Sequence, residues 1–318
     1  MEYSNKPSKK FKEAFLKLKN IPTIITFHSF GDLDACSSAI ALKEFLGQKT
    51  IIAVQDTINS QAKIVLKDYY KKFLKFEQAR KIYKNAKIIL VDCNHKSLLR
   101  HEINEVDFLI DHHAIGKDSL KVKHSFVWPE ASSTAELIAK LIKPNPRTAK
   151  LLIMGILADS SFLTHANAET FYIMYKLLKE NNLDFEKILT DMDIIESSKK
   201  RVEVLEAIKN IKIVESKGYV CAFGIVKEYQ AIIAENLIRI GADVAFVASN
   251  KEDCVICARM HKRNLFKVDL ISIVEEIGKI IKGEGGGHPL AAAVSGKEKK
   301  KCQIALEKAK ELFFSQLK

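Results

Sequence analysis

Four apolar runs of this chain are each followed by side chains that can bind metal ions or move protons. These side chains are His28, Asp32 and Asp34 after residues 21–27, Asp92 after 87–91, Asp111, His112 and His113 after 108–110, and Asp159 after 151–158. Taken one at a time they have ordinary explanations, because aspartates cap helices and turns and histidine pairs are common at surfaces. These explanations no longer suffice if the fold brings all of these side chains to one place.

Gathered at one place, these carboxylates and imidazoles would repel one another strongly unless cations were bound among them. Divalent metal ions remove that repulsion. The mixture of hard carboxylate and borderline imidazole ligands suits Mn²⁺; Co²⁺, Fe²⁺ and Zn²⁺ are also compatible, and Mg²⁺ alone fits less well. We therefore predict a divalent-metal site.

The order of the predicted elements indicates that these side chains meet. Buried strands are predicted over residues 21–28, 49–55, 86–92 and 107–111. Helices are predicted over residues 33–46, which end at Gly47, over a Lys-rich stretch at 60–83, and over a short surface segment at 10–19. Such alternation favours an α/β fold with a mainly parallel sheet flanked by helices. In open α/β sheets, ligands bind beyond the carboxyl ends of the strands.

The rest of the chain predicts a helical region and then a second α/β unit. Residues 132–200 are helical in pattern, with a capping start at 132–136, and the charged segment 185–207 is interpreted as a linker helix. Strands are then predicted near residues 208–214, 219–225, 244–249 and 254–260, and helices near 270–281 and 299–314.

Composition agrees with a two-domain globular protein. The chain has 318 residues, of which 47% are hydrophobic and 28% charged, so disorder as the main state is excluded. The formal charge of +12 favours anionic partners such as nucleic acid or nucleotides, although a Lys-rich and Ile-rich chain can also reflect a hot habitat. With no apolar leader and no 18-residue apolar window, a soluble, cytoplasmic protein is expected.

The six cysteines are interpreted as reduced core thiols. Cys254 and Cys257 form a C-x-x-C motif inside a predicted strand, which would turn the two side chains to opposite faces. No second C-x-x-C accompanies them, so a zinc site is not indicated.

The motifs resemble those of the DHH phosphoesterase superfamily. The residues that carry the resemblance are His28-x-x-x-Asp32-x-Asp34, Asp92, Asp111-His112-His113, Asp159 and the C-terminal stretch 283–292, which is similar to the GGGH loop of the DHH-associated domain. The resemblance covers residues 21–296 in the family's order and points to the two-domain oligoribonuclease (nanoRNase) and cyclic-dinucleotide phosphodiesterase members. Gly31 replaces the family's usual proline, and Ser160-Ser161 its usual Thr-Gly; neither change removes a ligand.

The resemblance implies the following organisation. Residues 1–186 would form the catalytic domain, 187–206 a linker helix and 207–318 a smaller substrate-binding domain, with the active site in the interdomain cleft. One Mn²⁺ would be held by His28, Asp32 and Asp92 and a second by Asp34, Asp92, His112 and Asp159, with Asp92 bridging. Two such ions activate a hydroxide for attack on phosphorus. Asp111 would orient the neighbouring histidine ligand, and His113 would face the scissile phosphate.

The second domain is expected to bind the substrate. Gly285, Gly286 and Gly287 could expose backbone N–H groups to an oxyanion, and His288 could add a donor. Arg259 is similar to a family arginine that holds a terminal phosphate or base. The alternatives are a flexible turn for the glycines and a structural role for Arg259.

The function implied is a manganese-dependent phosphodiesterase that hydrolyses short RNA or DNA oligonucleotides, or cyclic dinucleotides such as cyclic di-AMP, to mononucleotides. The alternatives are a single-strand-specific exonuclease, a 3′-phosphoadenosine 5′-phosphate phosphatase, and a non-catalytic nucleotide sensor or scaffold. A manganese pyrophosphatase shares the metal motifs but not the GGGH domain. A monomer and a homodimer both stay open, and no membrane partner is expected.

Overall fold

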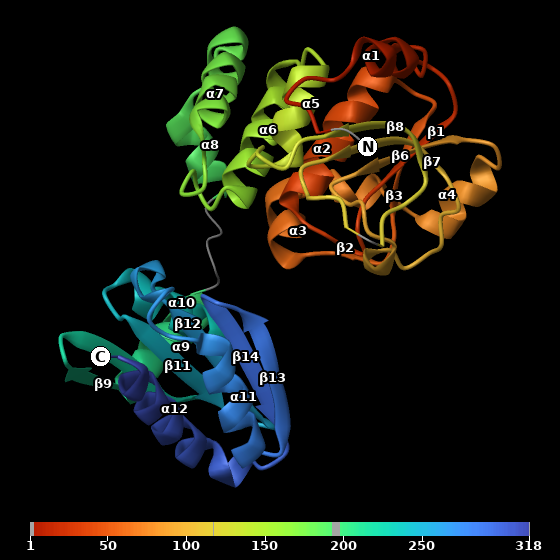
Figure 1. Ribbon diagram of the computed structural model, residues 1–318. Coiled ribbons are helices and arrows are strands. Elements are labelled where there is room, and N and C mark those ends of the chain that lie inside the picture. The colour runs from red at the N-terminus through yellow and green to blue at the C-terminus, as the bar shows by residue number, and fades with distance from the viewer. Residues whose placement is uncertain (1–2, 117, 193–197, 318) are drawn as a thin grey trace. The chain divides into compact units, whose positions relative to one another are not determined.

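The computed structural model describes residues 3–116, 118–192 and 198–317, apart from the side chains of residues 199 and 200 (Figure 1). The chain divides into two compact units, residues 1–194 and 195–318. Within the described ranges, no helix is both long enough and apolar enough to cross a bilayer.

The first unit is built on a six-stranded sheet whose strands are all parallel, in the order β5-β3-β1-β6-β7-β8. The strands are β1 (Thr23–Thr26), β3 (Thr50–Val54), β5 (Leu74–Lys75), β6 (Lys87–Val91), β7 (Val106–Asp111) and β8 (Val122–Val127). A separate two-stranded pair joins β2 (Phe30–Gly31) to β4 (Thr57–Ile58). The central strands are apolar and buried because helices cover both faces, which confirms the predicted α/β fold.

The helices of the first unit are α1 (Lys9–Leu16), α2 (Leu33–Leu46), α3 (Ser60–Leu66), α4 (Phe76–Ile82), α5 (Thr134–Leu141), α6 (Pro146–Asp159), α7 (Ala168–Asn181) and α8 (Phe185–Met192), with short 3₁₀ turns at Tyr70–Lys72 and Lys96–Leu98. Helix α2 has the predicted bounds, since Asp32 caps its first turn and Gly47 follows its last residue. Helix α1 is not merely a surface helix, because Phe11 and Phe15 are buried in the core.

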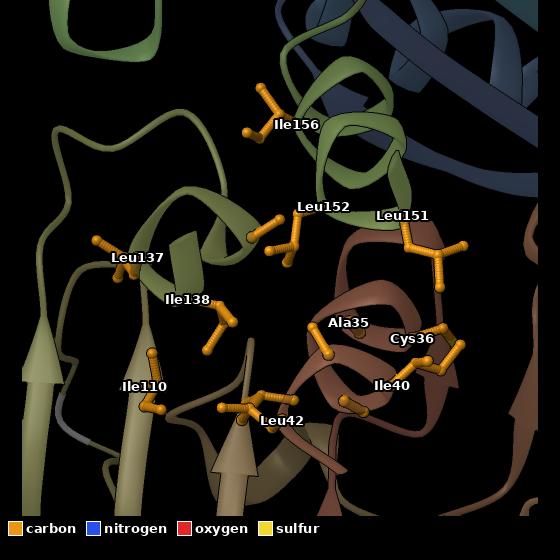
Figure 2. Packing of buried hydrophobic residues seen from close by; sticks show 14 of the residues in the cluster. Ala35, Cys36, Ile40, Leu42, Ile110, Leu137, Ile138, Leu151, Leu152 and Ile156 are labelled. Carbon is orange, nitrogen blue, oxygen red and sulfur yellow. The ribbon is translucent and has the colours of Figure 1, made fainter. Parts of the chain in front are cut away.

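One core cluster joins helices α2, α5 and α6 to the sheet (Figure 2). Its labelled side chains are Ala35, Cys36, Ile40 and Leu42 from α2, Leu137 and Ile138 from α5, Leu151, Leu152 and Ile156 from α6, and Ile110 from β7. A second cluster packs Phe76 and Ala79 of α4 against the opposite face. The ends of α2, α5 and α6 are therefore fixed relative to the strand ends.

One expectation for the first unit is wrong, and one edge strand had no counterpart among the predicted elements. Residues 60–83 do not form one helix: α3 ends at Leu66, the next residue, Lys67, has a positive φ of 48°, and the short edge strand β5 separates α3 from α4. Strand β8 was not predicted. It lies at the sheet edge and has three consecutive polar residues, Lys123, His124 and Ser125, so it lacks the continuous apolar run of a central strand.

The second unit contains a mixed six-stranded sheet in the order β13-β14-β12-β11-β10-β9, in which only β10 and β11 are parallel. Its elements are α9 (Ser198–Ala207), β9 (Ile211–Ser216), β10 (Tyr219–Val226), α10 (Gln230–Arg239), β11 (Val244–Ser249), β12 (Cys254–Met260), α11 (Leu270–Ile280), β13 (Gly283–His288), β14 (Ala291–Gly296) and α12 (Cys302–Gln316), with 3₁₀ turns at Ile208–Asn210, Lys262–Asn264 and Lys299–Lys301. Helices α11 and α12 pack on one face and α10 on the other.

The glycine-rich segment is a strand, not a loop. Gly283–His288 forms β13 and pairs with β14 at the sheet edge. A Cβ added to Gly283 would lie 1.9 Å from the carbonyl oxygen of Ser295, so only glycine permits this close approach. Such a strand has no β-branched or alternating signal, which is why the sequence did not indicate it.

The predicted linker helix cannot be followed along its whole length. Helices α8 and α9 lie on either side of residues 193–197, which are outside the described ranges.

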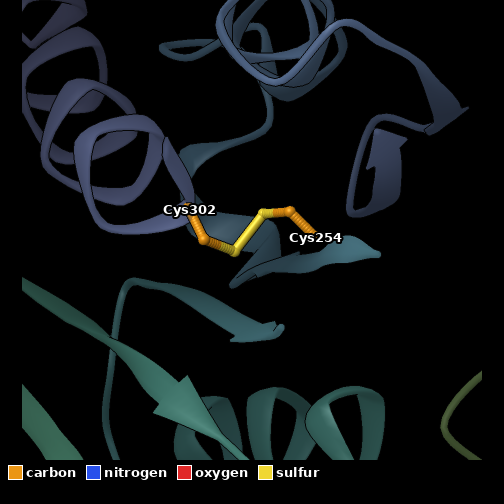
Figure 3. The surroundings of a disulfide bond; sticks show 2 residues. All are labelled: Cys254 and Cys302. Atoms are coloured by element: carbon orange, nitrogen blue, oxygen red, sulfur yellow. A yellow bond between two sulfur atoms is a disulfide. The ribbon is translucent and has the colours of Figure 1, made fainter. Parts of the chain in front are cut away.

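The prediction that all cysteines are reduced is wrong. Cys254, the first residue of β12, is joined by a disulfide to Cys302, the first residue of α12 (Figure 3). The two residues are 48 positions apart in sequence and become neighbours because α12 packs on the sheet. Cys36, Cys93, Cys221 and Cys257 are free and buried, as expected.

Candidate metal centre

The predicted ligand residues converge at one edge of the first unit's sheet. Strands β1, β6 and β7 are neighbours, and their carboxyl ends lead into His28, Asp92 and the Asp111–His113 segment. Helix α2 brings Asp32 and Asp34 at its start, and α6 brings Asp159 at its end. Three sets of side chains lie close enough to hold a metal ion: His28–Asp32–Asp92, Asp34–His112–Asp159 and Asp92–His112–His113.

Asp92 belongs to the first set and also faces His112 of the second. Its Oδ2 is 3.6 Å from Nε2 of His28, and its Oδ1 is 3.5 Å from Nε2 of His112. On the outer sides, Nε2 of His28 is 3.9 Å from Oδ2 of Asp32, and Nε2 of His112 is 3.1 Å from Oδ2 of Asp159. Each oxygen of Asp92 therefore faces a different set.

The backbone of Asp92 has an uncommon conformation. Its φ is 57°, in the left-handed region that asparagine and aspartate tolerate better than most residues. Its side chain is buried and accepts a 2.9 Å hydrogen bond from the hydroxyl of Thr134. Backbone strain of this kind persists where the surrounding structure enforces it, most often at functional sites.

Asp34 is held by the amino-terminal end of α5. The backbone N–H groups of Thr134 and Ala135 donate to its two carboxylate oxygens at 2.7 and 2.8 Å. Gly155 of α6 allows this arrangement, since an added Cβ would lie 3.0 Å from Cβ of Ala135 and 3.1 Å from Oδ1 of Asp34. Sequence reasoning identified the start of α5 but not its contact with Asp34, which joins residues 100 positions apart.

The electrostatics of the site favour bound cations. Burial, together with the neighbouring acids, raises the pKa of Asp34 to about 8 and that of Asp92 well above its usual range. Burial lowers the pKa of His28 despite the nearby Asp32. At His112 burial opposes protonation, but the carboxylates of Asp159 and Asp34 outweigh it and raise the pKa to about 9. Metal ions would offset the repulsion among the buried acids without protonating them.

His112 is oriented as a metal ligand would be. Its Nδ1 lies 3.2 Å from the carbonyl oxygen of Ala131, a contact that places the ring proton on Nδ1. Its buried Nε2 has no hydrogen-bond partner among the described residues, although it faces Asp92 and Asp159. The two carboxylates demand a positive charge at Nε2: without metal they favour a second ring proton, in line with the raised pKa of His112, and a bound divalent ion would take its place, so these residues fit a divalent metal.

Asp111 contacts a different histidine from the one expected. Its Oδ1 lies 2.8 Å from Nδ1 of His113 and accepts a 3.1 Å hydrogen bond from the His113 backbone. The other oxygen accepts a 2.6 Å hydrogen bond from the buried amide of Asn94, which sequence reasoning missed. Asp111 therefore positions His113, not the candidate ligand His112. The His113 side chain is 53% exposed, so its outer edge can reach a substrate.

The predicted substrate-binding residues lie in the second unit. Arg259 of β12 and His288 of β13 are both paired with Ala291 of β14, which places them in one cross-strand row on one face of the sheet. In the same sheet Gly285 packs closely on α11, whereas a Cβ at Gly286 would meet open space. Nε of Arg259 lies 3.6 Å from the Glu235 carboxylate of α10, and its Nη1 donates to the carbonyl of Ala258 at 2.9 Å.

Two protein families match the chain in consecutive segments. The DHH family, N-terminal domain, matches residues 22–159, and the DHHA1 domain matches residues 198–314. The first match includes every predicted metal ligand, and the second includes Arg259 and the glycine-rich strand.

Individual relatives agree with these matches. An uncharacterized protein of Methanocaldococcus jannaschii is 28% identical over 296 residues, covering 87% of this chain and 88% of that protein. The cyclic-di-AMP phosphodiesterase GdpP of Geobacillus thermodenitrificans is 27% identical over 299 residues, which is 85% of this chain but only 44% of GdpP. The crystal structure of an exopolyphosphatase-related protein of Bacteroides fragilis superposes with a TM-score of 0.72 at 20% identity, covering 98% of this chain and 99% of that one.

Proposed function

Because the chain belongs to the DHH superfamily of phosphoesterases and is a hydrolase acting on phosphoester bonds, we propose that it is a manganese-dependent phosphodiesterase of short oligonucleotides or cyclic dinucleotides, which it converts to mononucleotides. The observation that carries the proposal is the placement of Asp92, with one carboxylate oxygen toward each of two potential ligand sets.

In this proposal, His28, Asp32 and Asp92 hold one divalent ion, and Asp34, Asp92, His112 and Asp159 hold the other. When bound, the two ions supply a hydroxide nucleophile at neutral pH and neutralise charge on the phosphate. The protein's own contribution is to hold the ligands in place: the α5 N–H groups fix Asp34, the Thr134 hydroxyl fixes Asp92, and the Ala131 carbonyl fixes His112.

His113 acts on the substrate in the same proposal. With Nδ1 against Asp111, its Nε2 is left to donate to an oxygen of the scissile phosphate or to the leaving group. Asn94 and Asp111 are positioning residues, because they fix the ring and do not touch the substrate themselves.

The two units divide the work in this proposal. Residues 1–186 form the catalytic domain and residues 207–318 bind the substrate. Arg259 holds a phosphate remote from the scissile bond, and His288 with Gly285, Gly286 and Gly287 binds phosphate oxygens through side-chain and backbone donors.

Activity is expected to require an added transition metal, with Mn²⁺ better than Mg²⁺, because the ligands combine carboxylates with imidazoles. Thoroughly demetallated protein should release no mononucleotide from the dinucleotide ApA, and titration with Mn²⁺ should restore release while raising the melting temperature. Full activity in the demetallated protein would contradict the proposal.

Activity on a panel of substrates distinguishes a linear from a cyclic substrate. The 27% identity to GdpP favours a cyclic dinucleotide among the candidates. Product chromatography with cyclic di-AMP, its linear product, ApA, a pentanucleotide and 3′-phosphoadenosine 5′-phosphate separates the alternatives. Release only from long single strands would support the exonuclease instead.

Arg259→Ala is expected to lower kcat/KM for dinucleotides. The loss of transition-state binding free energy should be about 2–4 kcal/mol, as for a charge-assisted phosphate contact. Hydrolysis of bis-(p-nitrophenyl) phosphate should change little, since this small diester has no second nucleotide. Steady-state kinetics on both substrates measure the difference.

Arg239→Ala is the matched control for Arg259. Arg239 also pairs with Glu235, at 3.2 Å, but it lies on α10 outside the cross-strand row. It should leave both substrates unaffected. Equal losses on both substrates for Arg259→Ala would withdraw its recognition role.

A further inference from the structure

Two exposed phenylalanines border the metal centre. Phe30 lies between His28 and Asp32 and is 61% exposed; Phe162 follows Asp159 by three residues and is 52% exposed. With 3.8 Å per residue step, Cα of Phe30 is within about 8 Å of those of His28 and Asp32, and Cα of Phe162 is within about 11 Å of that of Asp159. The two residues thus lie beside members of different ligand sets.

The ring of Phe30 is directed outward by the backbone of β2. A Cβ on Gly31 would lie 2.3 Å from the ring of Phe27, so Gly31 faces the interior and its strand neighbour Phe30 faces away from it. The segment is fixed by backbone hydrogen bonds, from Ser29 to Leu98 at 2.8 Å and from Thr57 to Ser29 at 2.9 Å. The close approach of Gly31 to the ring of Phe27 leaves no room for a Cβ, which explains why glycine replaces the family's proline at position 31.

Phe162 is presented by a strained turn. Ser161, Phe162 and Leu163 have φ values of 50°, 52° and 68°, an unfavourable region for bulky side chains. The turn is held by hydrogen bonds from the Phe162 N–H to the Leu157 carbonyl at 2.7 Å and from the Leu163 N–H to the Ser160 hydroxyl at 3.0 Å. Leu163 packs on the core while Phe162 does not, so the strain serves to expose one ring beside Asp159.

We propose that Phe30 and Phe162 are stacking platforms for the two nucleobases of a dinucleotide whose phosphodiester lies at the metal centre. Among the described residues, neither ring stacks on another aromatic side chain or on a cation. Stacking uses the face of any base, so these contacts add affinity with little base preference. This inference rests on the proposed function, because it supplies the base contacts for the same reaction.

The test compares Phe30→Leu and Phe162→Leu on ApA and on two analogues that carry an abasic site in place of one adenine, 5′ in one and 3′ in the other. Leucine keeps an apolar side chain but removes the aromatic ring. At position 162 it must also adopt the same positive φ as phenylalanine. Each variant should raise KM for ApA about 5- to 100-fold, with little change in kcat. Phe171→Leu, an equally exposed ring on α7 (53%), should change nothing.

Each variant should lose its effect on the analogue that lacks the base stacked on that ring. Equal losses on ApA and on both analogues would overturn the inference, since the rings would then be structural. If the wild type hydrolyses no dinucleotide, the proposed function fails, but stacking is still measured by the fluorescence increase of a 2-aminopurine–adenine dinucleotide in Ca²⁺, because its two bases separate when each lies on its own ring. A fluorescence increase that the leucine variants reduce supports the platforms; its absence in the wild type overturns them.

Discussion

Asp92→Ala is expected to lower kcat for dinucleotide hydrolysis by at least about 10³, as for loss of a preorganised charge partner in an active site. Asp92 is buried and presents one oxygen to each ligand set, so its removal disturbs both proposed ions. Steady-state kinetics in saturating Mn²⁺, combined with the metal content of the dialysed protein, measure the effect.

Asp92→Asn is the matched variant. Asparagine keeps the size of the side chain and tolerates the φ of 57°, but it removes the negative charge. Metal-free Asp92→Asn should melt no lower than the metal-free wild type, because one of several mutually repelling buried acids is gone. A variant with a tenth of wild-type activity and two bound metals would contradict the bridging role.

Removal of the Cys254–Cys302 disulfide is expected to lower the free energy of unfolding of the second unit by about 2–4 kcal/mol. The bond closes a loop between residues 48 positions apart and joins the start of β12 to the start of α12. The double variant Cys254→Ala/Cys302→Ala, unfolded in urea and followed by far-ultraviolet circular dichroism, should show the loss.

The chain supplies two controls for this measurement. Trp128 is the single tryptophan and lies in the first unit, so its fluorescence should report an unchanged transition. Cys257→Ala removes a free buried cysteine of β12. A reductant should destabilise this variant as much as it destabilises the wild type. If dithiothreitol shifts neither the wild type nor the double variant, the disulfide does not stabilise the unit.

The convergence of the candidate metal ligands could be predicted because each of them follows a local signal. Asp32 caps the 14-residue helix α2, and Asp92 follows the five-residue apolar strand β6; both features are continuous in the sequence. Parallel strands end at one edge of a sheet, so the carboxylates had to converge once the strands were recognised. The alternation of strand and helix patterns therefore indicated the fold of the first unit and the edge at which its candidate ligands meet.

Contacts between distant segments were decided only by the tertiary structure. The Thr134 backbone N–H donates to Asp34, and Gly155 leaves room beside it, because α5 and α6 pack on α2. Asn94, which follows β6, donates to Asp111 at the end of the neighbouring strand β7. The Cys254–Cys302 bond likewise depends on where α12 crosses the sheet. Threonine, glycine and cysteine carry no local signal of such roles, because the free energy of these contacts comes from packing between elements and not from the periodicity within one.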